Sequence, residues 1–492
     1  MSALSIAEIH AALPEGELLA SDGPNDVMIT GISQDSRLVE PGHLFVCIPG
    51  GTADGHDFAI EALERGAAAL LTERSLAPLS AVGDRGPVEI LVRSTRRCVG
   101  PLAAEVFGHP SRSMTVIGIT GTNGKTTTAH LIAAALSSES RAVEVIGTLS
   151  GTRTTPEAVE LQGRLAEFAA RGVEVVVMEV SSHALEMARV DGVRFAAVVF
   201  TNLGVDHLDL HGSIEAYFGA KARLFSPGFS GLAVINRDDP RGRELIGQIS
   251  NSMDVVGFSD DDVDVVDVGI AELHLRWRGN DVVVGLGGQF NVSNVVAALT
   301  VAHALGIEPD EAAARIGSVG VIDGRLEVFG GPDLGLPTVV VDYAHTPDGL
   351  EVLLETARAA AAGSGVVVVF GCGGDRDQHK RPLMGAAAIR GADRVIITSD
   401  NPRFEPPEQI VEQVLAGVPE QDLARVTVED DRRSAITIAV ESMGVGDIVV
   451  VAGKGHEHDQ EIAGVRYRFD DREVVAEVLA DLAHRTRGGG RS

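Results

Sequence analysis

The stretch from Thr115 to Leu136, TVIGITGTNGKTTTAHLIAAAL, constrains the fold more than any other part of the chain. A run of β-branched residues gives way to glycines spaced three apart and then to apolar residues at helical spacing, which predicts a strand, a loop and a helix. Glycine-rich loops at helix N-termini bind phosphate through backbone N–H groups, while a lysine adds charge and a hydroxyl reaches Mg²⁺. The stretch therefore predicts nucleotide binding, although Ile119 stands where the strict Walker pattern has glycine.

Composition narrows the remaining possibilities. A chain of 492 residues is long enough for about three domains that each bury a core. Its formal net charge of −29 disfavours nucleic acid and anionic membrane surfaces as partners, since both would repel it. Three cysteines are too few and too scattered for a disulfide framework, and no apolar run approaches the ~18 residues of a membrane span. We therefore expect a cytoplasmic enzyme without membrane insertion.

The first region, up to about Arg112, alternates short strands and helices, which predicts a small α/β domain. Polar residues gather at one predicted strand end, from Asp35 to Arg37, and in a glycine-containing loop, from Gly50 to His56. Such groups suit either tight turns or contacts with a ligand, and the residues alone leave both interpretations open.

The second region places polar residues directly after apolar strands. Glu179 follows the apolar run VEVVVM, and a carboxylate at a strand tip near a phosphate loop is suited to holding nucleotide-bound Mg²⁺. A polar cluster from Asn202 to His211 follows the run FAAVVF. Thr154 and Thr155 precede Pro156, so their hydroxyls either cap the next helix or touch a substrate. The second region is therefore where we expect the catalytic chemistry.

The third region contains four apolar strands that each end in a polar loop. In a parallel α/β sheet such loops line the ligand crevice, so their side chains should converge on one face. The residues concerned are Asp342, His345, Arg376, Lys380, Asn401, Arg403, Lys454 and Glu457. This pattern predicts a third α/β unit with a ligand site of its own.

Ordered motifs along nearly the whole chain resemble those of the Mur ligase family. They are DSR, PGHLFVCIPGG, GITGTNGKTTT, TTPE, MEVSSHAL, FTNLGVDHLDLHG, AKARLF, GRLE, DYAHTPDGL, GCGGDRDQHKRPLM, TSDNPRFEPPEQI and AGKGHE. The resemblance implies an α/β fold of three domains. These are a small N-terminal UDP-binding α/β domain (1–112), a central P-loop ATPase-like domain with a mostly parallel sheet (113–335), and a C-terminal Rossmann-like domain that binds an amino acid (336–492).

The resemblance also implies a reaction. Mur ligases are ATP-dependent amide-forming enzymes of peptidoglycan precursor synthesis, and this chain is most similar to members that add the third residue of the stem peptide. By that similarity, ATP phosphorylates the γ-carboxylate of UDP-N-acetylmuramoyl-L-alanyl-D-glutamate (UDP-MurNAc-L-Ala-D-Glu), and the amine of meso-diaminopimelate attacks the acyl phosphate. Mg²⁺ is the implied cofactor, ATP is the co-substrate, and we expect a monomer.

The family's functional residues carry over by position. The implied ATP site is Gly121, Thr122, Asn123, Gly124, Lys125, Thr126, Thr127, Asn294 and Arg325. The implied metal site is Thr126, Glu179, His207 and Lys221, with Lys221 carbamylated; Lys125, Glu179, His207 and Lys221 are the implied catalytic residues. The implied site for the UDP-linked substrate is Ser36, Thr52, Thr154, Thr155, Ser181 and Arg189. The implied meso-diaminopimelate site is Arg376, Asp400, Asn401, Pro402, Arg403, Gly453 and Glu457.

Two positions bear on specificity. Met187 stands where many relatives carry glutamine, so one substrate hydrogen bond is absent or supplied elsewhere. The sequence from Asp400 to Arg403, DNPR, resembles the version that selects meso-diaminopimelate, and a guanidinium group can bind the distal carboxylate that lysine lacks. Three alternatives stay open: a lysine-adding ligase of the same family, an enzyme similar to folylpolyglutamate synthetase, and a catalytically silent nucleotide-binding scaffold of cell-wall assembly.

Overall fold

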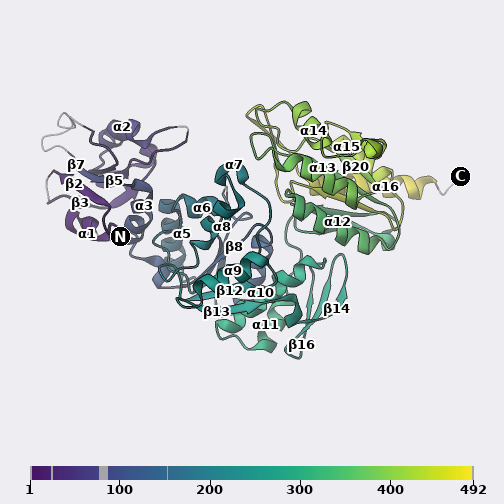
Figure 1. Ribbon diagram of the computed structural model, residues 1–492, viewed down its shortest axis with the longest axis horizontal. Coiled ribbons are helices and arrows are strands. Elements are labelled where there is room, and N and C mark those ends of the chain that lie inside the picture. Colours follow the sequence, from purple (N-terminus) through teal and green to yellow (C-terminus); the bar gives the residue numbers. More distant parts are fainter. Residues whose placement is uncertain (1–2, 24–25, 52, 77–86, 152, 490–492) are drawn as a thin grey trace.

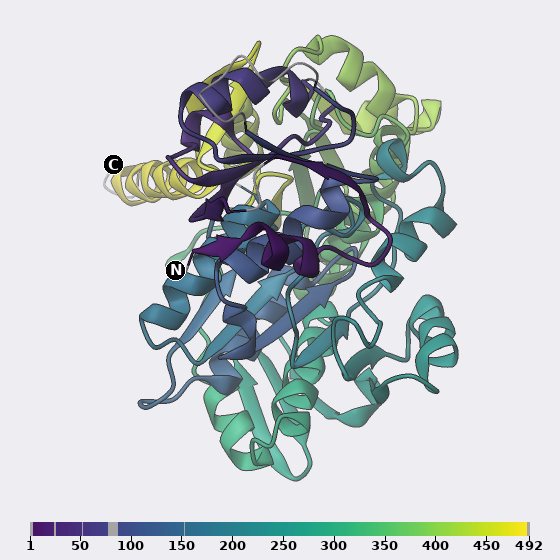
Figure 2. The same cartoon turned by 90° about the vertical axis from the view of Figure 1, so that its left-hand side faces the viewer.

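The computed structural model describes residues 3–23, 26–51, 53–76, 87–151 and 153–489. These residues form three lobes in a row, each built around one main sheet (Figure 1). In the view turned by 90°, the N-terminal lobe lies in front of the other two (Figure 2). The α/β fold of three domains expected from the sequence is confirmed. In the part of the chain described, no helix is long and apolar enough to cross a membrane.

The N-terminal lobe is a five-stranded sheet in the order β2-β7-β6-β5-β4, in which only β2 is antiparallel to its neighbour. Alternate residues of β7 are buried because one face of the sheet packs against α1 and α3. The elements are β1 (Leu4–Ser5), α1 (Ile6–Ala12), β2 (Leu18–Asp22), β3 (Met28–Ile29), β4 (Gly31–Ser33), β5 (His43–Val46), α2 (Ala59–Glu64), β6 (Ala69–Thr72), β7 (Val88–Val92) and α3 (Thr95–Val106).

The central lobe contains a six-stranded, fully parallel sheet in the order β13-β12-β11-β8-β10-β9. Helices α4 and α10 cover one face, and α5, α8 and α9 cover the other. The strands are β8 (Thr115–Thr120), β9 (Val143–Ile146), β10 (Val175–Glu179), β11 (Ala197–Phe200), β12 (Leu232–Asn236) and β13 (Asp254–Phe258). The helices are α4 (Lys125–Leu136), α5 (Ala158–Ala170), α6 (Ser182–Glu186), α7 (Leu208–His211), α8 (Ile214–Ala222), α9 (Pro240–Ile249), α10 (Phe290–Ala304) and α11 (Pro309–Ile316). Since the sheet changes winding direction around β8, the loops after β8, β10 and β11 meet at a switch point, where parallel sheets bind ligands.

A small antiparallel sheet extends the same lobe. It consists of β14 (Asp264–Val268), β15 (Leu273–Trp277) and β16 (Asn280–Val284). Its buried face, which includes Leu273, Leu275 and Trp277, joins the hydrophobic core beneath α4 and α10. This sheet therefore shares a hydrophobic core with α4, the helix that follows the phosphate loop.

The C-terminal lobe is a six-stranded sheet in the order β17-β18-β22-β19-β20-β21, parallel except for β17. Helices α12, α13 and α14 pack on one face, and α15 and α16 on the other. The strands are β17 (Glu327–Gly330), β18 (Thr338–Asp342), β19 (Val366–Phe370), β20 (Arg394–Ile397), β21 (Val426–Val428) and β22 (Ile448–Ala452), followed by a hairpin of β23 (Asp459–Ile462) and β24 (Val465–Arg468). The helices are α12 (Pro347–Ala361), α13 (Lys380–Gly391), α14 (Pro407–Leu415), α15 (Arg432–Glu441) and α16 (Asp471–Gly489).

The expected boundary between the second and third domains needs one correction. The sequence placed it at 335/336, but β17 pairs antiparallel with β18 and so belongs to the third sheet. The reason is that β17 supplies an edge strand whose backbone groups are satisfied by β18, a pairing that local sequence does not reveal. The third structural unit therefore includes β17, which begins at Glu327.

A buried ion pair joins α15 and α16 beneath β22, and it gives a prediction about stability. Arg432 donates to both carboxylate oxygens of Asp471, at 2.8 and 2.7 Å, and to the Ala452 carbonyl oxygen at 2.9 Å, with both ionic side chains fully buried. Replacing Asp471 with alanine should lower the free energy of unfolding by about 3–5 kcal/mol, because it leaves a buried charge unpaired. Urea unfolding of the variant measures this. The double variant Arg432→Met with Asp471→Leu should recover much of the loss; equal instability of the two variants would contradict the argument.

Candidate active site

A cavity of about 1410 Å³ lies between the central and C-terminal lobes. Its walls are the loops after β8, β10 and β11 on one side and the loops after β18, β19, β20 and β22 on the other. Of the eight third-region residues expected to converge, seven line this cavity, and Lys454 is fully buried behind it. Two sheets thus present their carboxyl edges to one shared space.

The phosphate loop depends on glycine at two positions. Gly121 has φ +157°, and a Cβ there would lie 1.9 Å from the Thr201 hydroxyl oxygen. Gly124 has φ +83° at the N-cap of α4, where a Cβ would lie 2.4 Å from Asn294 Oδ1. The Lys125 ammonium group donates to the Gly121 and Thr122 carbonyl oxygens, both at 2.9 Å, and burial lowers its pKa. The Lys125 side chain therefore folds back onto the phosphate loop, where it is expected to bind phosphate.

Glu179 lies opposite the start of α4 and is held from several sides. Its Oε1 accepts hydrogen bonds from the Thr126 hydroxyl at 3.0 Å and from the Thr148 backbone N–H at 2.8 Å, and its Oε2 accepts from the Thr148 hydroxyl at 3.2 Å. The Arg325 guanidinium group also donates to the Thr126 hydroxyl at 3.0 Å and stacks on the Tyr343 ring. Carboxylate, hydroxyl and guanidinium groups are thus assembled at the nucleotide end of the cavity.

Lys221 is buried rather than exposed. Its Nζ lies 4.4 Å from the centre of the Tyr217 ring and donates a hydrogen bond to the Gly121 carbonyl oxygen at 2.8 Å. Burial, together with the charge of Lys125, holds the pKa of Lys221 well below its usual value. The Tyr217 hydroxyl is bonded in turn to the Thr122 hydroxyl at 3.2 Å. The environment therefore favours a neutral amine at this position.

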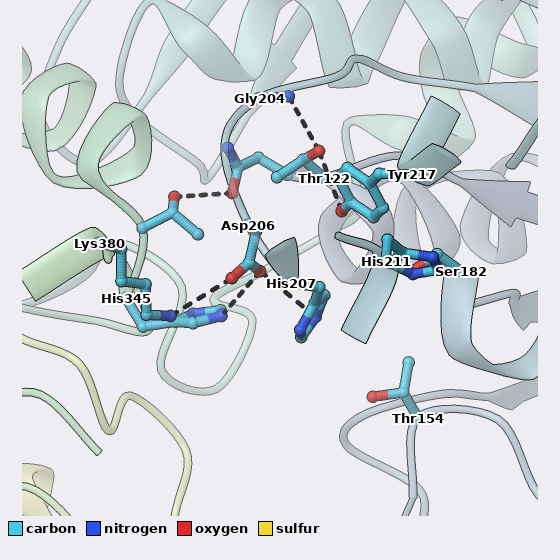
Figure 3. A network of polar contacts seen from close by, with 12 residues as sticks. Thr122, Thr154, Ser182, Gly204, Asp206, His207, His211, Tyr217, His345 and Lys380 are labelled. Carbon is cyan, nitrogen blue, oxygen red and sulfur yellow. Dashed lines mark hydrogen bonds and ion pairs between the residues drawn. The ribbon is translucent and has the colours of Figure 1, made fainter. Parts of the chain in front are cut away.

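Asp206 joins the two lobes across the cavity (Figure 3). Its carboxylate accepts a hydrogen bond from Lys380 at 3.4 Å and lies 3.7 Å from His345 Nε2 and 3.4 Å from His207 Nε2. Burial alone would raise the pKa of Asp206, but the His345 hydrogen bond and the Lys380 charge hold it far below its usual range. Burial lowers the pKa of His207 to about 4, so its ring is neutral near pH 7. A second link joins Thr346 to Asn123 at 3.4 Å.

The C-terminal wall presents the groups expected to bind an amino acid. Arg403, in a left-handed conformation with φ +52°, donates to the Gly374 carbonyl oxygen at 2.6 Å and lies 3.6 Å from the Glu461 carboxylate. The Asn401 side-chain N–H donates to Glu457 Oε2 at 2.8 Å. Only part of the donor capacity of Arg403 is used, so N–H groups remain for a bound carboxylate.

The structure brings most of the expected site residues to this cavity. It is lined by Thr122, Asn123, Gly124, Lys125, Thr126, Thr127, Thr154, Thr155, Glu179, Ser181, Arg189, His207, Lys221, Asn294, Arg325, Arg376, Asp400, Asn401, Arg403, Gly453 and Glu457. Gly121 contributes its carbonyl oxygen to Lys125 and Lys221. Pro402 lines a separate small cavity beside it. Met187, at the end of α6, is not among the residues of the wall.

The N-terminal candidates lie apart from this cavity. The Ser36 hydroxyl is bonded to the Glu61 carboxylate at 3.0 Å, and Asp35 accepts from the Arg37 backbone N–H as the cap of a short 3₁₀ helix, Ser36–Leu38. Thr52 lies outside the described residues. The turn interpretation therefore holds for Asp35, and among the described residues no expected N-terminal residue lines the cavity.

The structure decides whether the Thr155 hydroxyl caps the helix that follows it. Thr155 does not cap α5; its hydroxyl donates to the Glu179 carbonyl oxygen at 2.9 Å and accepts from the Ser181 backbone N–H at 3.0 Å. Asn294 lies within α10, and its Oδ1 accepts from the Thr128 hydroxyl at 3.1 Å. Both side chains fasten elements around the phosphate loop.

Sequence reasoning missed Thr148 and Tyr217. Thr148 follows β9, at the same edge of the sheet as the phosphate loop, so its place after an apolar strand was a usable signal. Tyr217 precedes Lys221 by four residues on α8, the spacing at which helix side chains are neighbours. Thr148 holds Glu179, and Tyr217 contacts Lys221; the sequence did identify both of these partners.

The residues present fit a hydroxyl- and carboxylate-bound Mg²⁺. Thr126 and Glu179 place two oxygens 3.0 Å apart beside the phosphate loop, and Mg²⁺ prefers oxygen ligands completed by substrate phosphates and water. Among the described residues, no group of three or more His, Cys, Asp or Glu side chains is arranged to hold a metal ion alone. A magnesium ion here would therefore depend on oxygens from the nucleotide.

A phosphate loop that faces arginine, asparagine and glutamate side chains across one cavity is the arrangement expected of a nucleotide-dependent ligase, and comparison with known families gives the class. The Mur ligase family catalytic domain matches residues 28–92, the Mur ligase middle domain residues 119–302, and the Mur ligase glutamate ligase domain residues 324–455. The chain belongs to the Mur ligase family, as the sequence motifs indicated.

Individual relatives are more specific. The chain is 45% identical to the UDP-N-acetylmuramoyl-L-alanyl-D-glutamate--2,6-diaminopimelate ligase of Chromobacterium violaceum, over 92% of this chain and 94% of that protein. It is 43% identical to the ligase of the same name from Aquifex aeolicus, over 92% and 94%. A solved structure of a ligase with this name is 34% identical, covers 98% of this chain and 99% of its own, and superposes with a TM-score of 0.66.

Proposed function

We propose that this protein is a cytoplasmic, ATP-dependent ligase that adds meso-diaminopimelate to UDP-MurNAc-L-Ala-D-Glu in peptidoglycan precursor synthesis. One observation carries the proposal: a single cavity joins the phosphate loop of the central lobe to the Asn401–Arg403 loop of the C-terminal lobe. Relatives at 45 and 43% identity bear the name of this activity. A silent scaffold would not need Lys125, Thr126 and Glu179 gathered beside an amino-acid site.

The chemistry requires activation because a carboxylate and an amine do not condense in water. The terminal phosphoryl group of ATP passes to the γ-carboxylate of the D-glutamyl residue, which gives an acyl phosphate and ADP. The amine of diaminopimelate then attacks the carbonyl carbon, and phosphate leaves as the amide forms. The enzyme's part is to hold the reactants in line and to neutralise phosphate charge.

The residues of the cavity are suited to holding the reactants and to neutralising phosphate charge. Lys125 supplies positive charge to the phosphates, and Thr126 with Glu179 would hold Mg²⁺, which offsets phosphate charge when bound. Neutral His207 is suited to assist as a ligand, because metal binding requires a deprotonated imidazole. Lys221 as a carbamate would add an anionic oxygen donor near the phosphate loop, whereas the protonated amine would repel a cation.

The UDP-linked substrate has groups for its peptide end on the central wall. Arg189 forms an ion pair with Glu157 at 2.7 Å and donates to the Thr155 carbonyl oxygen at 3.3 Å, while Ser181 caps α6. We propose that Thr154, Thr155, Ser181 and Arg189 receive the dipeptide and that Ser36 and Thr52 of the N-terminal lobe receive the uridine end.

The function is tested by measuring phosphate release and the ligated product with UDP-MurNAc-L-Ala-D-Glu, ATP and a panel of amines. We expect turnover with meso-diaminopimelate that depends on all three substrates. Higher kcat/KM with L-lysine would assign the protein to the lysine-adding ligases. Nucleotide binding without turnover for any amine would support a silent scaffold.

Amine choice gives a sharper prediction at Arg403. Diaminopimelate and lysine share the reacting amine, so the enzyme must discriminate by the distal carboxylate. Losing a charge-assisted hydrogen bond costs about 1.5–3 kcal/mol, so Arg403→Ala should lower kcat/KM for meso-diaminopimelate by at least roughly tenfold. The variant's preference for meso-diaminopimelate over lysine should shrink, while its KM for ATP stays unchanged. Arg403→Lys is the matched control, since an ammonium group cannot form the two-pronged contact. A variant that kept its full preference would show that another group is the selector.

A further inference from the structure

Lys454 is a fully buried lysine directly behind the amino-acid wall of the cavity. It follows β22 and Gly453, and its ammonium group donates to three acceptors: the Asp459 carbonyl oxygen at 2.7 Å, Glu457 Oε2 at 2.9 Å and Asn401 Oδ1 at 3.3 Å. An ammonium group has three N–H donors, so all of them are used. Lys454 therefore has no donor left for a ligand and can act only through the groups it holds.

The first of these groups is the Asn401 side chain. Its Oδ1 accepts from Lys454 and also from the Glu461 backbone N–H at 2.9 Å, which fixes the amide orientation. The amide nitrogen must then point the other way, where one N–H donates to Glu457 Oε2 at 2.8 Å. The second N–H has no hydrogen-bond partner among the described residues, and Asn401 lines the cavity. Asn401 is thus held as a donor, which is the role a bound carboxylate requires.

The second group is the Glu457 carboxylate. Its Oε2 accepts from both Lys454 and Asn401, while its side chain is 31% exposed and lines the cavity. The remaining oxygen, Oε1, is available to accept from an ammonium group. Lys454 thereby fixes one donor and one acceptor side by side, which matches the carboxylate and ammonium groups of a free amino-acid end.

We propose that Lys454 is a positioning residue that sets the specificity of this site for an amine substrate carrying a distal zwitterionic α-amino-acid group. The proposal rests on the function proposed above and deepens it. Lysine is uncommon in this chain, since only four of its 41 basic residues are lysines. The geometry of the lysine ammonium group suits the positioning role. A compact ammonium group can serve three acceptors around one point, whereas the planar guanidinium fork of arginine cannot.

The test is Lys454→Met, which keeps the length of the side chain and removes its donors. We expect KM for meso-diaminopimelate to rise at least tenfold and its advantage over lysine to narrow, with KM for ATP and for UDP-MurNAc-L-Ala-D-Glu unchanged. Arg390→Met is the matched control, because Arg390 is an exposed cation of the same lobe paired with Glu351, and it should change none of these values. A loss of kcat with an unchanged KM for meso-diaminopimelate and an unchanged preference for it over lysine would overturn the proposal.

Two further measurements separate positioning from general stability. In an Asn401→Ala background, Lys454→Met should have a clearly smaller effect on KM, because the group it holds is already missing; fully additive effects would contradict the proposal. If Lys454→Met does not fold, Lys454→Gln, which keeps two N–H donors, is measured in its place, with the same substrates and the same control variant. A wild-type enzyme inactive with meso-diaminopimelate would refute the proposed function instead, whereas an active wild type with an unaffected Lys454 variant would refute only this inference.

Discussion

Lys221→Ala should be almost inactive, with kcat lowered by roughly 10²–10³-fold, the usual loss when one electrostatic group is removed from such a site. The structure gives the reason: Lys221 is buried beside the phosphate loop and the Tyr217 ring, and burial together with the charge of Lys125 lowers its pKa, which favours the neutral amine. A neutral amine is the form that adds CO₂, and the resulting carbamate is an anion suited to Mg²⁺. We therefore propose that the carbamate, not the amine, is the working group.

The carbamate is tested by rescue and by labelling. Added acetate or propionate should restore part of the turnover of Lys221→Ala, because a small carboxylate can occupy the space left by the side chain. Wild-type protein equilibrated with ¹³C-bicarbonate should show a carbamate carbon signal that Lys221→Ala lacks. Arg223→Ala, which changes an exposed residue at the end of the same helix, is the control and should stay active. Full activity of Lys221→Ala without rescue would refute the carbamate.

Lys125→Ala should lose activity by a similar factor, roughly 10²–10³-fold, since one preorganised cation is removed from the transferring phosphoryl group. Its ammonium group bonds two carbonyl oxygens of its own loop, and these contacts can be exchanged for phosphate oxygens without refolding. The variant should therefore keep its unfolding temperature. Measured turnover and thermal unfolding test both statements, with Arg315→Ala as a control on the neighbouring helix α11. Near-normal turnover would remove Lys125 from the catalytic site.

The phosphate loop shows how far local sequence reaches. The strand, the glycines and the helix from Lys125 were predictable because each depends on neighbours in sequence: β-branched residues favour strands, and a residue with positive φ at a helix N-cap favours glycine. The polar loops after apolar strands were equally readable, since parallel strands bring their carboxyl ends to one edge. For these elements the structure adds distances to a pattern already present.

The contacts that the predicted groups make with distant segments could not be predicted from local sequence. Glu179 is held by Thr148, which is 31 residues distant in sequence, and β17 joins the third sheet rather than the second. Lys454 was expected to face a ligand, yet it is buried and points at Asn401 across 53 residues. Each of these facts depends on how sheets and helices pack, which no local pattern specifies.

The sequence by itself determined the kind of chemistry, because phosphate binding and carboxylate recognition require particular residue types at fixed short spacings, as in Gly121–Thr127 and Asp400–Arg403. Only the tertiary structure decided which groups line the cavity and which groups hold them in place. The physical reason is that exposure, hydrogen-bond saturation and a depressed pKa arise from surroundings supplied by distant segments. Lys221 and Lys454 are alike in sequence as single lysines after small residues, and packing alone gives Lys221 its lowered pKa and Lys454 its three hydrogen-bond acceptors.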